Sequence, residues 1–312
     1  MTLVVCPNLA VDRVLELPEL EPGADLRATC VRQQAGGKGA NVVRALRSLG
    51  GDGRLVGFAA GRTGLLIAQL ADDEGIALEF VALAGEARIC MVFLEAEGRR
   101  TSVYEYGPPV GPTDEHALVE AVRAQHAAGG EWAVLSGSAP PGASVEFYAD
   151  LVGALHQAKY KVMLDATDEQ LAGALAQRPA LVKVNAVEAA SVTGVSGMDE
   201  RAALSSARRL VEAGAGAAVI TLGAAGAAVF DDGALLTVST PPVETVNAVG
   251  SGDCFAAALA LGLERGLSIQ AALPLAAGAG AANAVSLGTA DLDADLARRL
   301  ATEAAVLTRS AE

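Results

Sequence analysis

Short apolar runs alternate with alanine-rich segments of helical length along most of this chain. The apolar runs lie at 3–6, 54–58, 133–136, 161–164, 181–184 and 217–222, and the helical segments at 40–49, 65–74, 114–127, 144–157 and 200–213. Apolar strands separated by helices join as right-handed βαβ units, which form a parallel sheet covered on both faces. The alternation therefore predicts an α/β fold with a doubly wound, mostly parallel sheet.

Two segments, 11–34 and 87–106, interrupt this rhythm because they are too polar for buried parallel strands and alternate apolar with polar positions. The sequence Glu97-Gly98-Arg99 between two such runs indicates a hairpin turn. We expect both segments to form a small β-sheet, the lid, whose free face could pair with a second copy of the chain. An ordinary edge hairpin would produce the same pattern. The whole of 1–312 is predicted to be one domain.

The last third of the chain has a different pattern, which begins after Pro241-Pro242. Helical segments follow one another there at 255–264, 269–285 and 292–307. We expect these helices to pack together on one face of the sheet.

Charge and cysteine usage exclude several classes of partner. The formal net charge of −14 over 312 residues argues against nucleic acid and anionic membranes, which bind massed Lys and Arg. The four cysteines are far apart, so neither a disulfide framework nor a zinc site can be recognised. The first residues lack the regions of a signal peptide, and we expect a cytoplasmic protein.

A glycine-rich loop, Gly250-Ser251-Gly252, stands directly before a predicted helix and is followed by Asp253. Backbone N–H groups at a helix N-terminus favour an anion, so this loop is a candidate phosphate site. Asp253 could be a general base beside that anion, or simply a carboxylate that stabilises a helix N-terminus.

A second glycine cluster, Ala35-Gly-Gly-Lys-Gly-Ala-Asn41, also leads into a helix. It lacks the Ser or Thr that follows the lysine of a P-loop, and the Gly250 loop lacks the third glycine of a dinucleotide-binding fingerprint. Two separate glycine-rich helix starts, one with an acid and one with Lys38 and Asn41, indicate two substrates, one of them a phosphate donor.

Six motifs in order resemble those of the PfkB (ribokinase-like) sugar kinases, and the resemblance covers the whole chain. They are 8–12, 35–50, 135–142, 182–188, 220–226 and 247–259. The phosphosugar branch, with 1-phosphofructokinase and tagatose-6-phosphate kinase, is the most similar. The resemblance implies a ribokinase-like fold and ATP with Mg²⁺ as cofactors.

The resemblance also implies roles for individual residues. Asp253 matches the catalytic base, and Gly250, Ser251 and Gly252 match the anion hole. Positions that match the sugar and its phosphate are Asp12, Arg27, Gly37, Lys38, Asn41 and Arg88. Positions that match the nucleotide site are Lys183, Asn185, Glu188, Thr221, Gly223, Gly226 and Asn283, with Mg²⁺ held indirectly through Asn185, Glu188 and the ATP phosphates. Arg27 and Arg88 could instead be solvated strand charges, and Asn283 an interior polar group.

The implied reaction is phosphorylation of fructose 1-phosphate at its C6 hydroxyl. Tagatose 6-phosphate is the second candidate, followed by an unphosphorylated sugar or nucleoside and by a non-catalytic sugar-phosphate sensor. The chain departs from the family pattern at Leu9, Cys90, Val184 and Ala248. Cys90 bears on sugar choice, because fructose-type enzymes often have Asn there and a thiol is a poor hydrogen-bond partner.

Overall fold

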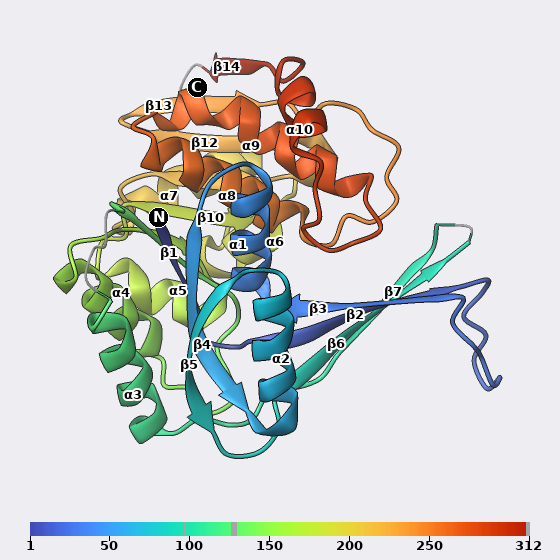
Figure 1. Cartoon of the computed structure of the whole chain (residues 1–312). Coiled ribbons are helices and arrows are strands. Elements are labelled where there is room, and N and C mark those ends of the chain that lie inside the picture. Colours follow the sequence, from blue (N-terminus) through green and yellow to red (C-terminus); the bar gives the residue numbers. More distant parts are fainter. Residues whose placement is uncertain (97, 126–129, 310–312) are drawn as a thin grey trace.

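The computed structural model describes residues 1–96, 98–125 and 130–309 and has the expected α/β architecture (Figure 1). Within the described residues the central sheet consists of β1 (Thr2–Cys6), β4 (Gly53–Ala60), β5 (Ala77–Leu83), β8 (Trp132–Ser136), β9 (Lys161–Asp165), β10 (Leu181–Asn185), β11 (Ala218–Thr221), β12 (Ala227–Asp231), β13 (Ala234–Val238) and β14 (Val306–Arg309). Their order is β14-β13-β12-β11-β10-β9-β8-β1-β4-β5. Neighbours from β11 to β5 are parallel, and β12, β13 and β14 add antiparallel pairs at one edge.

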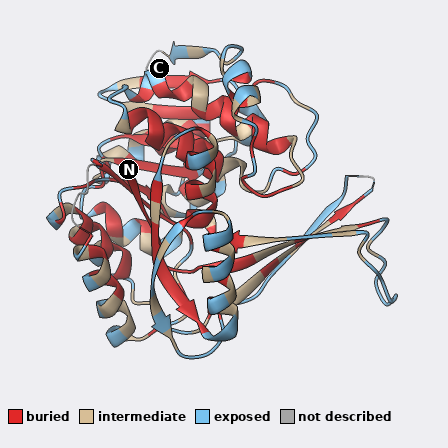
Figure 2. Cartoon of the chain, in the orientation of Figure 1, coloured by how far each residue is buried: buried red, intermediate tan, exposed pale blue. Residues whose placement is uncertain are grey.

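Helices cover both faces of this sheet, as the alternation predicts. One face carries α1 (Lys38–Ser48), α2 (Gly61–Asp73), α8 (Ser251–Glu264), α9 (Ile269–Ala284) and α10 (Ala294–Ala301). The other carries α3 (Pro112–Arg123), α4 (Phe147–Gln157), α5 (Asp168–Leu175), α6 (Ala186–Thr193) and α7 (Glu200–Glu212), and the short 3₁₀ turn η1 (Gly223–Ala225) follows β11. A buried apolar cluster on each face joins helices to sheet (Figure 2). The predicted end of the 114–127 helix falls partly outside the described residues.

The helix expected over 292–307 is wrong in its second half. The helix α10 ends at Ala301, and Val306–Arg309 instead forms β14, which pairs antiparallel with β13. An edge strand exposes unpaired backbone N–H and C=O groups, and β14 satisfies those of β13. The partner strand lies about seventy residues earlier in the chain, so the local pattern does not indicate the pairing.

The lid is a separate sheet of β2 (Ala10–Leu17), β3 (Cys30–Gly36), β6 (Arg88–Glu95) and β7 (Arg100–Tyr104), in the order β3-β2-β6-β7. Figure 1 shows it projecting from the core on the right. The central strands β2 and β6 are parallel and place Asp12 opposite Cys90. Gly98, with φ +79°, makes the turn between β6 and β7, and its N–H donates to the Glu95 carbonyl at 2.9 Å. Both segments that interrupt the sequence rhythm therefore build one small sheet, as expected.

In the part of the chain that the structure describes, none of the helices has both the length and the apolar composition needed to span a bilayer.

Candidate active site

The candidate site lies at the carboxyl ends of the parallel strands. Strand β1 is flanked by β8 on one side and β4 on the other, so the chain winds outward in both directions from this point. In doubly wound sheets, ligands bind in the crevice at such a switch point. A cleft of about 530 Å³ opens there beneath the lid. The predicted residues that line it are Asp12, Gly37, Lys38, Asn41, Arg88, Lys183, Asn185, Glu188, Thr221, Gly223, Gly250, Ser251, Gly252 and Asp253.

The Gly250 loop is built so that only glycine fits at its turn. Gly250 caps α8 with φ +84°, and a Cβ atom there would lie 2.8 Å from the Ala290 nitrogen and 2.9 Å from the Thr289 Cγ2. The first turn of α8 then directs its N–H groups toward the cleft end of the helix, where they favour an anion. The Lys183 ammonium lies beside this candidate anion site, because a Cβ on Gly252 would be 3.3 Å from its Nζ.

Asp253 follows this loop and is buried, with 6% of its surface exposed. Its Oδ2 accepts a hydrogen bond of 2.8 Å from the Asn41 amide nitrogen. Burial and the nearby Asp165 raise the pKa of Asp253 to about 6, against the opposing effect of Lys38, Lys183 and Asn41. A carboxylate with that pKa is mostly ionised at neutral pH and remains basic enough to accept a proton.

Two lysines share one buried aspartate at the floor of the cleft. The Asp165 carboxylate accepts from Lys38 Nζ at 2.8 Å and from Lys183 Nζ at 2.7 Å. Although burial alone would favour a neutral carboxyl, the two lysines hold the pKa of Asp165 below its usual value. Lys38 also donates to Glu188 at 3.0 Å, and these two acids outweigh its burial and raise its pKa. The Lys38 ammonium therefore stays charged.

Asp165 belongs to this site and was not predicted from the sequence. It directly follows the apolar run predicted at 161–164, at the carboxyl end of β9. A carboxylate at that end of a buried parallel strand is a recognisable signal, since ligands bind at this edge.

Asn185 and Glu188 form the N-terminal capping box of α6. Asn185 Oδ1 accepts from the Glu188 N–H at 2.9 Å, and Glu188 Oε2 accepts from the Asn185 N–H at 2.8 Å. In the described part of the chain, no three His, Cys, Asp or Glu side chains gather closely enough to hold a metal ion. Direct coordination by a carboxylate cage therefore does not fit these residues, whereas an ion carried on a nucleotide's phosphates needs no such cage.

The lid supplies the opposite wall of the cleft. Asp12 on β2 and Cys90 on β6 lie side by side, and burial raises the pKa of both, that of Cys90 to about 11. Arg88, at the start of β6, donates from Nε and Nη2 to the Asn8 carbonyl at 3.3 and 3.0 Å. These contacts hold one edge of the guanidinium against the core, at the base of the lid.

Three predicted residues lie outside the lining of this cleft. Arg27 is exposed in the loop between β2 and β3 and does not reach the cleft of its own chain. Gly226 lines a neighbouring cavity of about 450 Å³ that shares Thr221, Gly223, Ser251 and other residues with the cleft. Asn283 is fully buried behind the loop, where it donates to the Val249 carbonyl and Ser251 Oγ at 2.9 and 3.0 Å.

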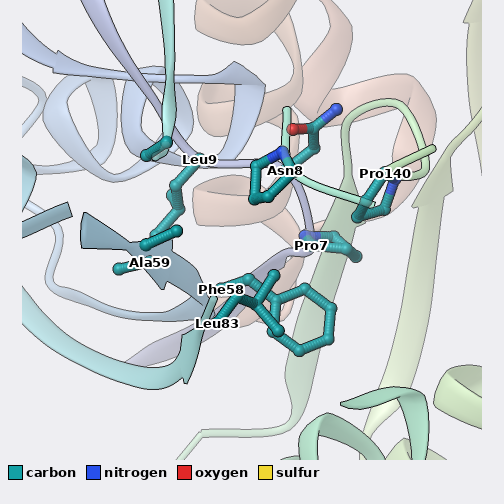
Figure 3. Close-up of a pocket in the computed structure, with 10 residues that line it drawn as sticks. Pro7, Asn8, Leu9, Phe58, Ala59, Leu83 and Pro140 are labelled. Atoms are coloured by element: carbon teal, nitrogen blue, oxygen red, sulfur yellow. The ribbon is translucent and has the colours of Figure 1, made fainter. Parts of the chain in front are cut away.

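Figure 3 shows a small crevice at the base of the lid. Pro7, Leu9, Phe58, Leu83 and Pro140 line it, and the free volume is about 10 Å³. That volume suits a single water at most, and most of the lining is apolar. The crevice is therefore packing at the junction of core and lid, where β1 continues into β2.

Residues 1–295 match the pfkB family of carbohydrate kinases. The chain is 29% identical over 291 residues to 1-phosphofructokinase of Bacillus subtilis, covering 93% of this chain and 95% of the relative. It is 30% identical over 286 residues to D-tagatose-1-phosphate kinase of Bacillus licheniformis, covering 91% and 93%. Solved structures of Escherichia coli phosphofructokinase-2, with potassium and with fructose-6-phosphate, match with TM-scores of 0.90 and 0.87, 26% identity and coverage of 97% and 98%. The chain belongs to the pfkB family of carbohydrate kinases.

Proposed function

We propose that this kinase transfers the γ-phosphoryl group of ATP to the C6 hydroxyl of a ketohexose 1-phosphate, with fructose 1-phosphate as the preferred acceptor. The observation that carries the proposal is the position of Asp253, a buried carboxylate beside the Gly250 loop and the Lys183 ammonium. A base, an anion site and a cation therefore meet in one cleft, as transfer to a hydroxyl requires.

The reaction follows from this arrangement. The acceptor oxygen attacks the γ-phosphorus, the bond from that phosphorus to the β-bridging oxygen breaks, and ADP leaves with the bond's electrons. Asp253 accepts the hydroxyl proton as the new bond forms. The N–H groups at the start of α8 and the Lys183 ammonium stabilise charge on the transferring group. Closure of the lid would exclude water and limit ATP hydrolysis.

The neighbouring cavity of about 450 Å³ is the proposed place of the adenine and ribose. Apolar and small residues, among them Pro242, Phe255, Ala277 and Gly280, line it, and it opens into the cleft at Thr221 and Gly223. A nucleotide lying there would direct its phosphates toward the Gly250 loop. Mg²⁺ would neutralise those phosphates, with Asn185 and Glu188 acting on it indirectly.

The acceptor proposal is supported by the names of the relatives. Two of them, 1-phosphofructokinase and D-tagatose-1-phosphate kinase, are named for ketohexose 1-phosphates. Fructose 6-phosphate is the second candidate, because phosphofructokinase-2 has been crystallised with it. Tagatose 6-phosphate and unphosphorylated acceptors are not favoured by these relatives. A silent sensor is disfavoured because Asp253 and the glycine loop are both in place.

An acceptor screen tests this proposal. ADP release is measured with fructose 1-phosphate, tagatose 1-phosphate, tagatose 6-phosphate, fructose 6-phosphate, fructose and ribose. We expect the highest kcat/KM for fructose 1-phosphate, and about 10- to 100-fold lower values for fructose because it lacks charge-assisted bonds to the phosphate. A higher kcat/KM for fructose 6-phosphate or for a free sugar would overturn the assignment.

The outer face of the lid is the proposed dimer interface. The strand register places a row of apolar side chains opposite the Asp12 and Cys90 face, namely Leu15, Val31, Met91, Phe93 and Val103. Val31 and Val103 are 56% and 45% exposed in the single chain, and an apolar face of this kind favours a partner surface. We expect light scattering to give a dimer mass that Met91→Glu reduces to a monomer. A wild-type monomer at micromolar concentration would contradict the interface.

Two broader assignments accompany this function. We propose that 1–312 acts as one α/β domain, because the lid and the core share the same cleft. We also propose a cytoplasmic location, since ATP is the phosphoryl donor and all four cysteines are free thiols.

A further inference from the structure

Arg44 lies one helical turn after Asn41 on α1, and its side chain is largely buried, at 12% exposed. Its Nη1 donates to Asn41 Oδ1 at 2.9 Å, and the Asn41 Nδ2 donates in turn to Asp253 Oδ2 at 2.8 Å. A guanidinium has only donors, so it must face the oxygen end of the amide. Arg44 therefore selects the amide orientation in which Asn41 presents its N–H group to Asp253.

Other contacts hold Arg44 in place between the end of α2 and strand β3 of the lid. Its Nε donates to Glu74 Oε2 at 2.7 Å, and Glu74 Oε1 accepts from the Ala35 N–H at 2.9 Å. The Arg44 Nη2 also donates to the Ala35 carbonyl. Ala35 belongs to β3 and is fully buried. Arg44 and Glu74 together therefore bind both the carbonyl and the N–H group of this lid residue.

Arg44 also contacts the segment that supports the glycine loop. Its Nη1 lies 3.3 Å from the Thr289 carbonyl, which additionally accepts from Gln34 Nε2 at 2.7 Å. Thr289 and Ala290 are the residues that pack against Gly250. A single side chain thus connects strand β3 of the lid, the Asn41 amide and the backing of the anion site.

We propose that Arg44 is a positioning residue for phosphoryl transfer, which orients the Asn41 amide toward Asp253 and ties that orientation to strand β3 of the lid. The proposal rests on the proposed role of Asp253 as the base. Arg44 acts through Asn41, and its side chain has no hydrogen bond to Asp253 among the described contacts.

The consequence concerns the protonation of Asp253. The charged groups that shift its pKa are Asp165 on β9, Lys38 on α1 and Lys183 on β10. The thiols of Cys6 on β1 and Cys254 on α8 also lie near Asp253, whose charge helps to raise their pKa. Burial and Asp165 raise its pKa, whereas the two lysines and the Asn41 hydrogen bond lower it. Without Arg44 the amide can rotate and present its oxygen instead. An acceptor at that position favours the protonated acid, so the pKa of Asp253 rises and less base is available at neutral pH.

The test compares Arg44→Met and Arg44→Lys with a matched control, Arg47→Met, on the same helix. Arg47 is 41% exposed and its only ion pair among the described contacts is a 3.9 Å pair with Asp52. We expect Arg44→Met to lose about 2- to 10-fold in kcat at pH 7 and to regain activity as pH rises, because an upward displacement of its acid limb by about one to two units protonates Asp253 at neutral pH. Arg44→Lys keeps a charged donor, and its limb should lie closer to that of the wild type. Arg47→Met should match the wild type.

A substrate-free measurement separates this proposal from the proposed function. The Asp253 carboxylate is titrated by infrared difference spectroscopy in wild type and Arg44→Met, with Asp253→Asn as the subtraction. An upward displacement in Arg44→Met supports the positioning role whichever sugar the enzyme accepts. An unchanged titration, or a kcat lowered by the same factor at every pH, would overturn it. If Arg44→Met does not fold, Glu74→Gln replaces it, with a smaller displacement expected in the same direction.

Discussion

Replacing Asp253 with asparagine is expected to lower kcat by about 10²- to 10⁴-fold, the usual contribution of a positioned general base. Asparagine has nearly the same shape and can still accept from Asn41, but it cannot take the hydroxyl proton. ATP affinity should persist, since the loop amides and Lys183 remain in place. Steady-state kinetics and calorimetric ATP titration measure the two effects.

The wild-type pH profile provides the companion measurement. Because the pKa of Asp253 is raised to about 6, kcat should fall as pH decreases through that value and the carboxylate becomes protonated. Asp295→Asn is the matched control, since Asp295 is 92% exposed on α10 and should leave kcat unchanged. A near wild-type kcat in Asp253→Asn would remove Asp253 from the proton transfer.

Replacing Arg88 with alanine is expected to raise KM for the ketohexose phosphate by about 10- to 150-fold, the range for one or two hydrogen bonds between charged groups. Arg88 lines the cleft, and its contacts with the Asn8 carbonyl hold the guanidinium at the base of the lid. Arg88→Lys keeps the charge without the planar fork, so an intermediate KM is expected. Initial rates against phosphosugar concentration measure this effect.

Unphosphorylated fructose and a second arginine serve as controls for Arg88. Fructose has no phosphate for Arg88 to bind, so its kcat/KM should change little in Arg88→Ala. Arg100 lies exposed on β7 of the same sheet, and Arg100→Ala should leave both substrates unaffected. Equal losses of kcat/KM for fructose and for the phosphosugar would contradict a phosphate-binding role.

Much of the fold could be predicted because its signals are local. Apolar runs such as 133–136 are buried strands because both faces of a parallel sheet are covered, and the alternation at 87–106 indicates a half-exposed sheet. The helix predicted over 292–307 is wrong beyond Ala301, where α10 ends. Pairing with β13 then decides the structure of Val306–Arg309, and that strand is distant in sequence.

In the candidate site, too, the residues with a local sequence signal could be predicted, whereas those that depend on distant contacts could not. Glycine loops before helices identify Gly250 and Gly37 from sequence, because a positive φ at a helix start is a local requirement. Asp165 and Arg44 were not predicted, because important partners lie far away in the chain: Lys38 for Asp165, and Glu74 and Thr289 for Arg44. Lys38 and Asp165 are 127 positions apart, and Asn41 and Asp253 are 212 apart.

The sequence by itself determined the α/β alternation, the two-part lid and the two glycine-rich helix starts, because periodicity and glycine conformation act over a few residues. Only the tertiary structure decided the antiparallel edge with β14, the exposed position of Arg27 and the placement of Asn283 behind the loop. It also decided the charge network around Asp165 and Asp253. Ion pairs and buried hydrogen bonds depend on distances of about 3 Å between atoms whose residues are far apart in the chain, and folding alone sets those distances.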